Sequence, residues 1–157
     1  YWMSFGSFWD GLKLVKLDSS LTKLAQPQQW HSIAKRPRDP LLPDSDAGNG
    51  AIEAPYIFRK NGYFYLFVSF DKCCRGKDSD YKIMVGRSKS VTGPYLDKTG
   101  KDLNAGGGSL VLQGDKDWVA LGHNAAYTLD GKDYLVFHFH CRAFNPVFPF
   151  SGNSAVV

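Results

Sequence analysis

Hydrophobic and polar residues alternate in short runs along most of the chain, and turn-forming residues separate the runs. In the run 12–17, leucines at 12, 14 and 17 are set against lysines at 13 and 16, which predicts a strand with one buried face. Runs rich in aromatic and branched residues predict further strands. The predicted strands are 2–5, 12–17, 56–58, 63–70, 81–87, 110–112, 124–129 and 134–140. This pattern predicts an all-β fold.

The segment 18–50 lacks such alternation. It holds prolines at 27, 37, 40 and 43 and the run Gly48-Asn49-Gly50. Because proline and glycine interrupt regular elements, we expect mostly loop here, with a short helical turn near 20–25.

Two predicted hairpins resemble each other. Asn61-Gly62 and Asp130-Gly131 each join two aromatic-rich strands, as hairpin turns do. Aligning the two glycines also places Phe58 on Tyr127, Tyr65 on Tyr134, Leu66 on Leu135 and Phe70 on Phe139. Copies roughly 65–70 residues apart, each with three or four short strands, are typical of propeller blades. The spacing predicts two to three blades of a β-propeller, and an ordinary β-sandwich is the alternative.

Composition narrows the class of protein. The chain has 157 residues, of which 43% are hydrophobic and 15% aromatic, which is enough for one compact domain with a core. No run approaches the roughly 20 apolar residues of a transmembrane helix. The net charge of +4 is spread along the chain rather than gathered in a stripe. We therefore expect neither a membrane nor a nucleic acid as partner.

The three cysteines, Cys73, Cys74 and Cys141, cannot all pair within the chain. Adjacent cysteines can form a vicinal disulfide but not an ordinary loop-closing one. No Cys-x-x-Cys spacing indicates a zinc site. The cysteines leave the cellular compartment open.

Glu53 is the first candidate for chemistry. It lies between a Gly-rich loop and an aromatic strand, in the run Ala51-Ile52-Glu53-Ala54-Pro55-Tyr56. A carboxyl group among apolar neighbours can stay protonated near neutral pH, as the general acid of a glycosidase must. From the residues alone, an ordinary surface glutamate at a loop end is the commoner case.

His123 follows a glycine at the predicted start of a strand, where it could be a metal ligand or a proton carrier. A hydrogen-bonded structural histidine is the alternative, and the residues alone favour it. His138 and His140 share one strand face, but no third ligand stands at a convincing spacing, so we interpret them as structural or rim groups. The chain lacks a Gly-x-Ser-x-Gly nucleophile elbow and a phosphate-binding loop.

Several motifs occur in order along residues 1–140. They are YWMSFGSFWDG at 1–11, IEAPYI at 52–57, FDKCCRG at 70–76, VGRSKS at 85–90 with TGPY at 92–95, and GHN at 122–124. On these motifs the chain resembles endo-1,5-α-L-arabinanases of glycoside hydrolase family 43, as an internal or C-terminal fragment. The resemblance implies part of a five-bladed propeller with arabinan bound in a cleft across one end.

The resemblance also implies a mechanism, the inverting hydrolysis of internal α-1,5-L-arabinofuranosyl linkages by three acidic residues. Glu53 matches the general acid. The base and the pKa-tuning aspartate of the family fall before Tyr1, so we expect the isolated chain to be inactive. His123 matches a histidine that helps to hold calcium, with water completing the shell, because one imidazole alone is a poor calcium ligand.

Substrate contacts are expected at strand ends and turns that face such a cleft. The candidates are Ser4, Ser7, Phe8, Trp9 and Phe70. Trp9 either stacks on a sugar ring or fills the core.

The likeness ends after His140. We therefore expect a partial propeller domain at 1–140 and a divergent tail at 141–157 that does not belong to the family fold, as in a truncated or misread gene model. We also expect a secreted monomer whose signal peptide lies outside this sequence.

The sequence leaves three alternative functions. The chain could have another family 43 activity, either exo-arabinofuranosidase or β-xylosidase; it could be a non-catalytic carbohydrate-binding propeller; or it could be a sandwich-type binding protein.

Overall fold

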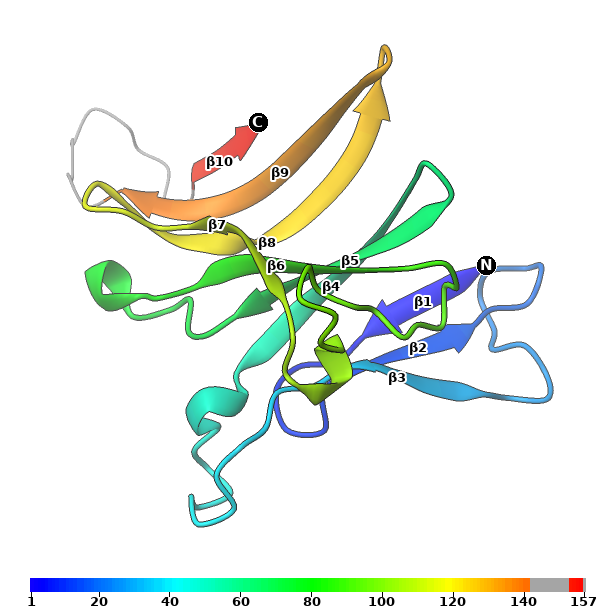
Figure 1. The fold of residues 1–157 in the computed structure, drawn as a ribbon, viewed down its shortest axis with the longest axis horizontal. Helices are drawn as coiled ribbons and strands as arrows, with labels where there is room; N and C mark the ends of the chain where they lie inside the picture. The colour runs from blue at the N-terminus through cyan, green and yellow to red at the C-terminus, as the bar shows by residue number, and fades with distance from the viewer. Residues whose placement is uncertain (142–152, 157) are drawn as a thin grey trace.

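The computed structural model describes residues 1–141 and 153–156. Ten strands in these residues form three antiparallel sheets, and each strand pairs with its neighbour in sequence. The first sheet contains β1 (Trp2–Phe5), β2 (Leu12–Lys16) and β3 (Trp30–Ala34); the second contains β4 (Ile52–Lys60), β5 (Tyr63–Phe70), β6 (Lys82–Ser88) and β7 (Ser109–Gln113); the third contains β8 (Trp118–Leu129), β9 (Lys132–Cys141) and β10 (Asn153–Val156). The sheets follow one another in chain order (Figure 1), which confirms the all-β prediction. Three successive sheets do not fit the sandwich alternative, which has two.

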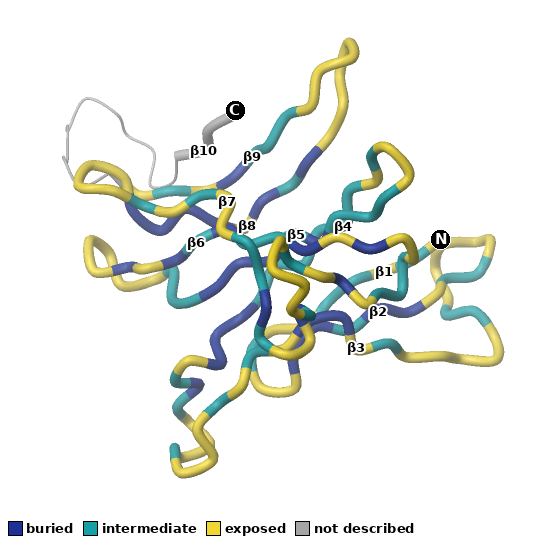
Figure 2. The backbone as a smooth tube through the Cα atoms, viewed as in Figure 1, coloured by how far each residue is buried: buried dark blue, intermediate teal, exposed yellow. Residues whose placement is uncertain are grey.

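Two hydrophobic clusters hold the sheets together. The first joins the first and second sheets, where Leu12 and Leu14 of β2 pack with Ile52, Leu66 and Val68, all almost fully buried. The second joins the second and third sheets through Ile83, Leu121 and Phe137. Buried backbone gathers where the sheets meet, whereas the hairpin ends are exposed (Figure 2). Each sheet is therefore stabilised by burying a face against its neighbour.

The two predicted hairpins are present. Lys60 pairs with Tyr63 around Asn61-Gly62, and Leu129 pairs with Lys132 around Asp130-Gly131. All four turn residues have positive φ, as two-residue hairpin turns with asparagine, aspartate and glycine do. The similarity between the hairpins therefore reflects equivalent positions in successive sheets.

The prediction for residues 18–50 was wrong in part. Residues 30–34 form β3, which pairs with β2 and buries Ile33 and Ala34 in the first cluster. This strand is five residues long and lies between prolines, so its alternation is too short to stand out from the loop. The expected helical turn near 20–25 is absent; an isolated bridge joins Leu17 to Leu24 there.

The position of His123 was also wrong in detail. Strand β8 begins at Trp118, so His123 lies inside the strand rather than at its start. The pairing with β9 shifts register on both sides of Gly122. Such irregularity breaks the period-two pattern on which the prediction rested.

Two further expectations concern the loops and the tail. Cys73 and Cys74 form a vicinal disulfide in the loop between β5 and β6, which the sequence had left open. The boundary at residue 140 stays a prediction, and residues 142–152 and 157 of the proposed tail lie outside the described residues.

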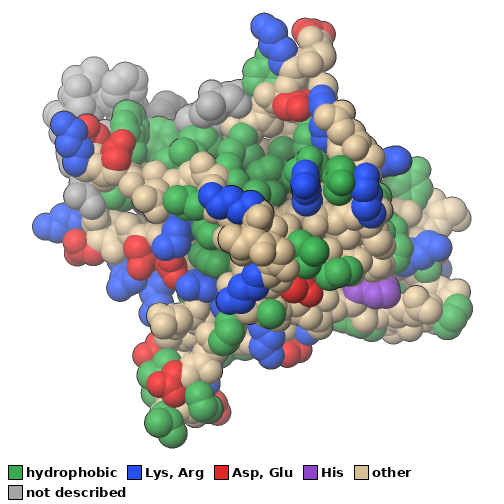
Figure 3. Space-filling model, viewed as in Figure 1, with side chains coloured by type: hydrophobic (Ala, Val, Ile, Leu, Met, Phe, Trp, Pro, Cys, Tyr) green, Lys and Arg blue, Asp and Glu red, His purple; other side chains and the backbone are tan. Residues whose placement is uncertain are grey.

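The surface carries mixed charge. On the face drawn in Figure 3, basic and acidic side chains are interspersed, in agreement with the scattered charge of the sequence. The described residues contain no helix with the length and apolar character needed to span a membrane.

Candidate active site

Glu53 lies at the start of β4, opposite Ser69 of β5. The pairing register shifts between Glu53 and Tyr56, and Ala54 between them has a φ of +53°. Pro55 stands in the same irregularity and has no N–H for the ladder. A bulge re-aims nearby side chains and often adjoins a functional site. The bulge therefore sets Glu53 apart from the regular pleat of residues 56–60.

Both carboxyl oxygens of Glu53 accept a hydrogen bond. The phenol hydroxyl of Tyr81, just before β6, donates to Oε1 at 2.7 Å, and the hydroxyl of Ser7 donates to Oε2 at 3.3 Å. Tyr81 is only 3% exposed, whereas Ser7 is exposed. Within the described part of the chain, no ion pair involves Glu53. Neutral donors, one buried and one exposed, thus hold this carboxyl group.

The loop after β1 is docked beside the carboxyl group. The N–H of Phe8 donates to the carbonyl of Ile52 at 2.6 Å, and the hydroxyl of Ser4 donates to the carbonyl of Pro55 at 3.2 Å. Phe8 and Trp9 have positive φ values of 52° and 26°. Such backbone is costly for residues with side chains and is concentrated at functional sites. The first sheet therefore contributes a loop that is hydrogen-bonded to the start of β4.

The five residues predicted to contact substrate differ in position and in exposure. Ser4 and Ser7 lie beside the start of β4, through the bonds above. Phe8 is half-buried, and Trp9 is 48% exposed with the Arg38 guanidinium 5.6 Å from its ring centre. Phe70 is 6% exposed and lies under the guanidinium of Arg36, 4.3 Å from its ring centre. Trp9 is therefore accessible to a ligand, whereas Phe70 is core.

Arg36 also ties the long loop before β4 to the second sheet. It donates to the carbonyl of Ala51 at 2.8 Å and to Oδ1 of Asp71 at 2.6 Å. Lys82 pairs with the other oxygen of Asp71 at 2.6 Å. Burial raises the pKa of Asp71, but the hydrogen bonds from Lys82 and Arg36 outweigh burial and hold that pKa below its usual value. Asp71 is therefore ionised, and its ion pairs link Arg36 of the loop before β4 to Lys82 of β6.

Other carboxylates of the site region are also paired. Asp10 pairs with Lys13 at 2.7 Å and Lys35 at 3.1 Å, and Asp80 lies 3.3 Å from Arg75. The bonds from Lys13 and Lys35 lower the pKa of Asp10. Among the described residues, Glu53 differs from these aspartates in having only neutral hydrogen-bond partners.

His123 does not form a metal cluster with its described neighbours. Its ring is exposed and stacks on His138 with 5.8 Å between ring centres. Asn124 is buried, with both amide atoms lacking a partner among the described residues. No group of three His, Cys, Asp or Glu in the described residues could hold a metal. Two imidazoles do not fit calcium, which prefers oxygen ligands, so the calcium site at His123 stays a prediction.

The sequence analysis did not identify three residues that contribute to the site. They are Tyr81, Ser69 and Gly122: the N–H of His123 donates to Oγ of Ser69 at 2.8 Å, and the ring of Tyr81 lies against Gly122. Tyr81 had been interpreted as the first residue of a strand and Ser69 as a strand residue. No local signal marks them, because their contacts join different sheets.

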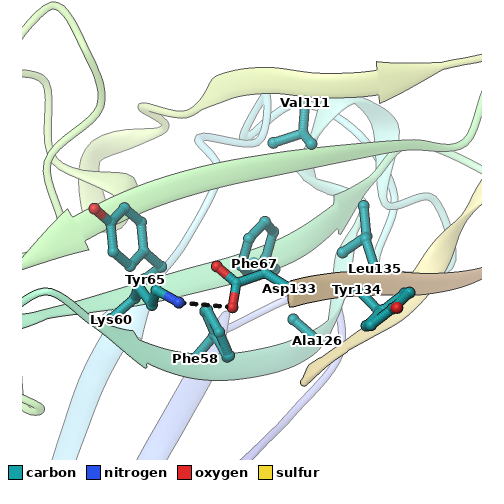
Figure 4. Close-up of a pocket in the computed structure, with 9 residues that line it drawn as sticks. All are labelled: Phe58, Lys60, Tyr65, Phe67, Val111, Ala126, Asp133, Tyr134 and Leu135. Carbon is teal, nitrogen blue, oxygen red and sulfur yellow. Dashed lines mark hydrogen bonds and ion pairs between the residues drawn. The ribbon is translucent and has the colours of Figure 1, made fainter. Parts of the chain in front are cut away.

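A separate cavity of about 380 Å³ opens at the other end of β4, between the second and third sheets (Figure 4). It is lined mostly by apolar and aromatic side chains. Its two charged residues, Lys60 and Asp133, pair at 2.9 Å, and the bonds from Lys60 and Thr128 lower the pKa of Asp133. The only carboxylate of the described residues that lines this cavity is thus engaged by a lysine and a threonine.

Comparison with known proteins identifies the family. Residues 1–150 match the model of glycosyl hydrolases family 43. The chain belongs to glycosyl hydrolase family 43.

Named relatives in family 43 act on arabinan-type linkages. The chain is 64% identical over 144 residues to the extracellular exo-α-(1→5)-L-arabinofuranosidase ArbA of Cellvibrio japonicus, covering 92% of this chain and 42% of that protein. It is 50% identical over 121 residues to the extracellular endo-α-(1→5)-L-arabinanase 1 of Bacillus subtilis, covering 77% of this chain and 34% of that protein.

A solved family 43 structure has the same fold. The α-L-arabinanase of Cellvibrio cellulosa, complexed with arabinohexaose, matches with a TM-score of 0.89 and 59% identity, over 99% of this chain and 48% of that chain. This family 43 chain therefore spans less than half the length of the relatives it matches, and its three sheets form part of a five-bladed β-propeller.

Proposed function

We propose that this chain supplies the general acid, Glu53, to a secreted family 43 enzyme that hydrolyses α-1,5-linked arabinan with inversion. The observation that carries the proposal is a carboxyl group held by Tyr81 and Ser7, without an ion pair, where the loop of the first sheet meets the second sheet. The extracellular arabinan-degrading relatives support the substrate class and the secretion.

The chemistry needs two carboxyl groups. In an inverting enzyme one protonates the departing sugar oxygen, and another, about 6.5–9.5 Å away, activates water on the opposite face. Glu53 takes the first role. Asp10 and Asp71 are engaged by lysine and arginine, so neither suits the second. The resemblance to family 43 arabinanases implies that the base and the pKa-tuning aspartate come from outside this chain, so we expect the isolated chain to be inactive.

Endo or exo action is the finer question. The ordered motifs favour cleavage of internal linkages, whereas the 64% identity to an exo-acting arabinofuranosidase favours release from chain ends. Early products from linear arabinan separate the two. Mixed oligosaccharides with a rapid fall in viscosity support endo action, and one short product with slowly falling viscosity supports exo action.

Glu53→Gln in the full-length protein tests the role of the acid. We expect hydrolysis of arabinan to fall about 10²–10⁴-fold with the fold retained. Asp78→Asn, an exposed change in the loop before β6, is the control and leaves the rate near wild type. Undiminished hydrolysis in Glu53→Gln would contradict the assignment.

A further inference from the structure

Tyr81 connects three parts of the fold through one side chain. It stands just before β6, its hydroxyl reaches Oε1 of Glu53 on β4, and its ring lies against Gly122 of β8. A Cβ on Gly122 would come within 2.0 Å of the ring, which real atoms cannot do. Only glycine at this position allows the ring to lie where its hydroxyl meets Glu53.

The hydrogen bonds behind Tyr81 run in one direction. The backbone N–H of His123 can only donate, and it donates to Oγ of Ser69 at 2.8 Å. Ser69 is fully buried, and its hydroxyl lowers the pKa of Tyr81 as a side-chain hydrogen-bond partner. The phenol of Tyr81 has one hydrogen, which it donates to Oε1 of Glu53 at 2.7 Å. The Tyr81 oxygen is then left to accept, and the Ser69 hydroxyl, which accepts from the amide, still has its own hydrogen to donate.

Tyr81 keeps that hydrogen at working pH. Burial raises the pKa of Tyr81, and the adjacent Glu53 raises it further, although the bond from Ser69 opposes this. The phenol of Tyr81 therefore stays protonated and keeps its hydrogen for donation to Glu53.

We propose that Tyr81 is the positioning residue of Glu53, occupying Oε1 so that the acid proton is carried on Oε2, the oxygen that faces Ser7. A protonated carboxyl group has one O–H and one remaining acceptor oxygen. Oε1 accepts the shorter bond, at 2.7 Å from the buried phenol, whereas Oε2 accepts only at 3.3 Å from the exposed Ser7, so Oε1 is the poorer place for the proton. Tyr81 thus selects which oxygen delivers the proton to the departing sugar. This role rests on the proposed function of Glu53.

Kinetics with two leaving groups test the role in the full-length protein. An arabino-oligosaccharide needs a proton on its departing oxygen, whereas the nitrophenyl glycoside of the same oligosaccharide does not. For Tyr81→Phe we expect kcat on the oligosaccharide to fall about 10–100-fold with KM nearly unchanged, and kcat on the nitrophenyl glycoside to stay within about threefold. Equal losses on both substrates, or no loss on either, would overturn the proposal.

The matched control is Tyr95→Phe. Tyr95 is equally buried, but its hydroxyl donates to the carbonyl of Val91 at 2.6 Å, away from Glu53. This variant loses a buried phenol hydroxyl in the same way, so we expect it to retain both rates.

A second measurement is independent of activity. Glu53 is the only glutamate of the 157 residues, so ¹³Cδ-glutamate labelling of the chain yields a single side-chain carboxyl resonance. That resonance should move in Tyr81→Phe and stay in place in Tyr95→Phe, and an unmoved resonance in Tyr81→Phe would overturn the contact. If the resonance moves but the full-length wild-type protein does not cleave arabinan, the proposed function fails while the positioning contact stands.

Discussion

The ring of Tyr81 lies so close to the backbone of Gly122 that a methyl group there would stand 2.0 Å from one ring carbon. The two residues are 41 positions apart in the sequence (122 − 81) and belong to adjacent sheets. Their contact fixes the phenol that holds Glu53.

Gly122→Ala should therefore displace Tyr81. Overpacking of this kind costs about 1–3 kcal/mol, and the displaced hydroxyl should also lower arabinan hydrolysis by the full-length protein. Thermal unfolding and the Glu53 carboxyl resonance measure the two effects. Gly131→Ala is the control, since a Cβ there meets no atom within 4 Å and only backbone strain is added. A variant Gly122→Ala with an unmoved carboxyl resonance would contradict this packing account.

Arg36→Leu should destabilise the chain by about 2 kcal/mol, because the change leaves Asp71 with a single cation and removes charged hydrogen bonds. Urea unfolding measures the difference. Lys35→Leu, next to it, removes an exposed pair with Asp10 and should cost clearly less, because solvent screens exposed ion pairs. Equal losses in the two variants would show that the pair between Arg36 and Asp71 contributes little.

The contribution of Asp71 should depend on pH. Its pKa is lowered in the folded state, so the ionised carboxylate stabilises the fold above the unfolded value of 3.8, and this stabilisation is lost as pH falls through the lower folded pKa. Unfolding free energies of wild type and Asp71→Asn should differ most above about pH 5 and converge in acid. A difference that does not vary with pH would contradict the assignment.

Asp97 closes the loop 97–108. Its Oδ1 accepts from the N–H and hydroxyl of Thr99 and from the N–H of Lys101, and its Oδ2 accepts from the N–H of Gly108 at 3.0 Å. These bonds, the Gly108 bond foremost, lower the pKa of Asp97. Asp97→Asn keeps only one acceptor oxygen, so the Gly108 amide should exchange its hydrogen faster by NMR. Asp102→Asn, which loses one local bond to Asn104, is the control; unchanged exchange at Gly108 would count against the closure.

Trp9→Ala should weaken substrate binding. Its ring is about half exposed beside the docked loop, and loss of a stacking aromatic costs about 0.5–1.5 kcal/mol, which corresponds to a KM about 2–12-fold higher with kcat retained. Trp30→Ala is the control, because Trp30 is exposed on β3 against Phe5. The same rise in KM in both variants would indicate a general effect rather than a sugar contact.

The strands and turns were predicted from local sequence signals, namely the alternation of hydrophobic and polar residues and the turn-forming residues. The hairpins around Gly62 and Gly131 were found because two-residue turns need residues that tolerate positive φ. Strand β3 was missed because its burial comes from the neighbouring sheet and not from its own short pattern. His123 was misplaced for a similar reason, since bulges on either side of Gly122 break the alternation.

Glu53 could be found from the sequence, first as a carboxylate between a Gly-rich loop and a strand and then through the ordered motifs around it. Phe70 shows the limit of that approach. It was expected to touch substrate because it ends a strand, yet Arg36, 34 positions earlier (70 − 36), covers its ring.

By itself the sequence determined the strand-rich fold, its repeat and its single glutamate, because alternation and turn chemistry act over a few residues. Only the tertiary structure decided which groups hold that glutamate. Ser7 and Tyr81 lie 46 and 28 positions from Glu53. Ser7 comes from the neighbouring first sheet, whereas Tyr81 stands beside β6 of the same sheet as Glu53, with its ring against Gly122 of the third sheet. Strand pairing within the second sheet and packing between sheets, which no local pattern encodes, together bring the two hydroxyl groups to one carboxyl group.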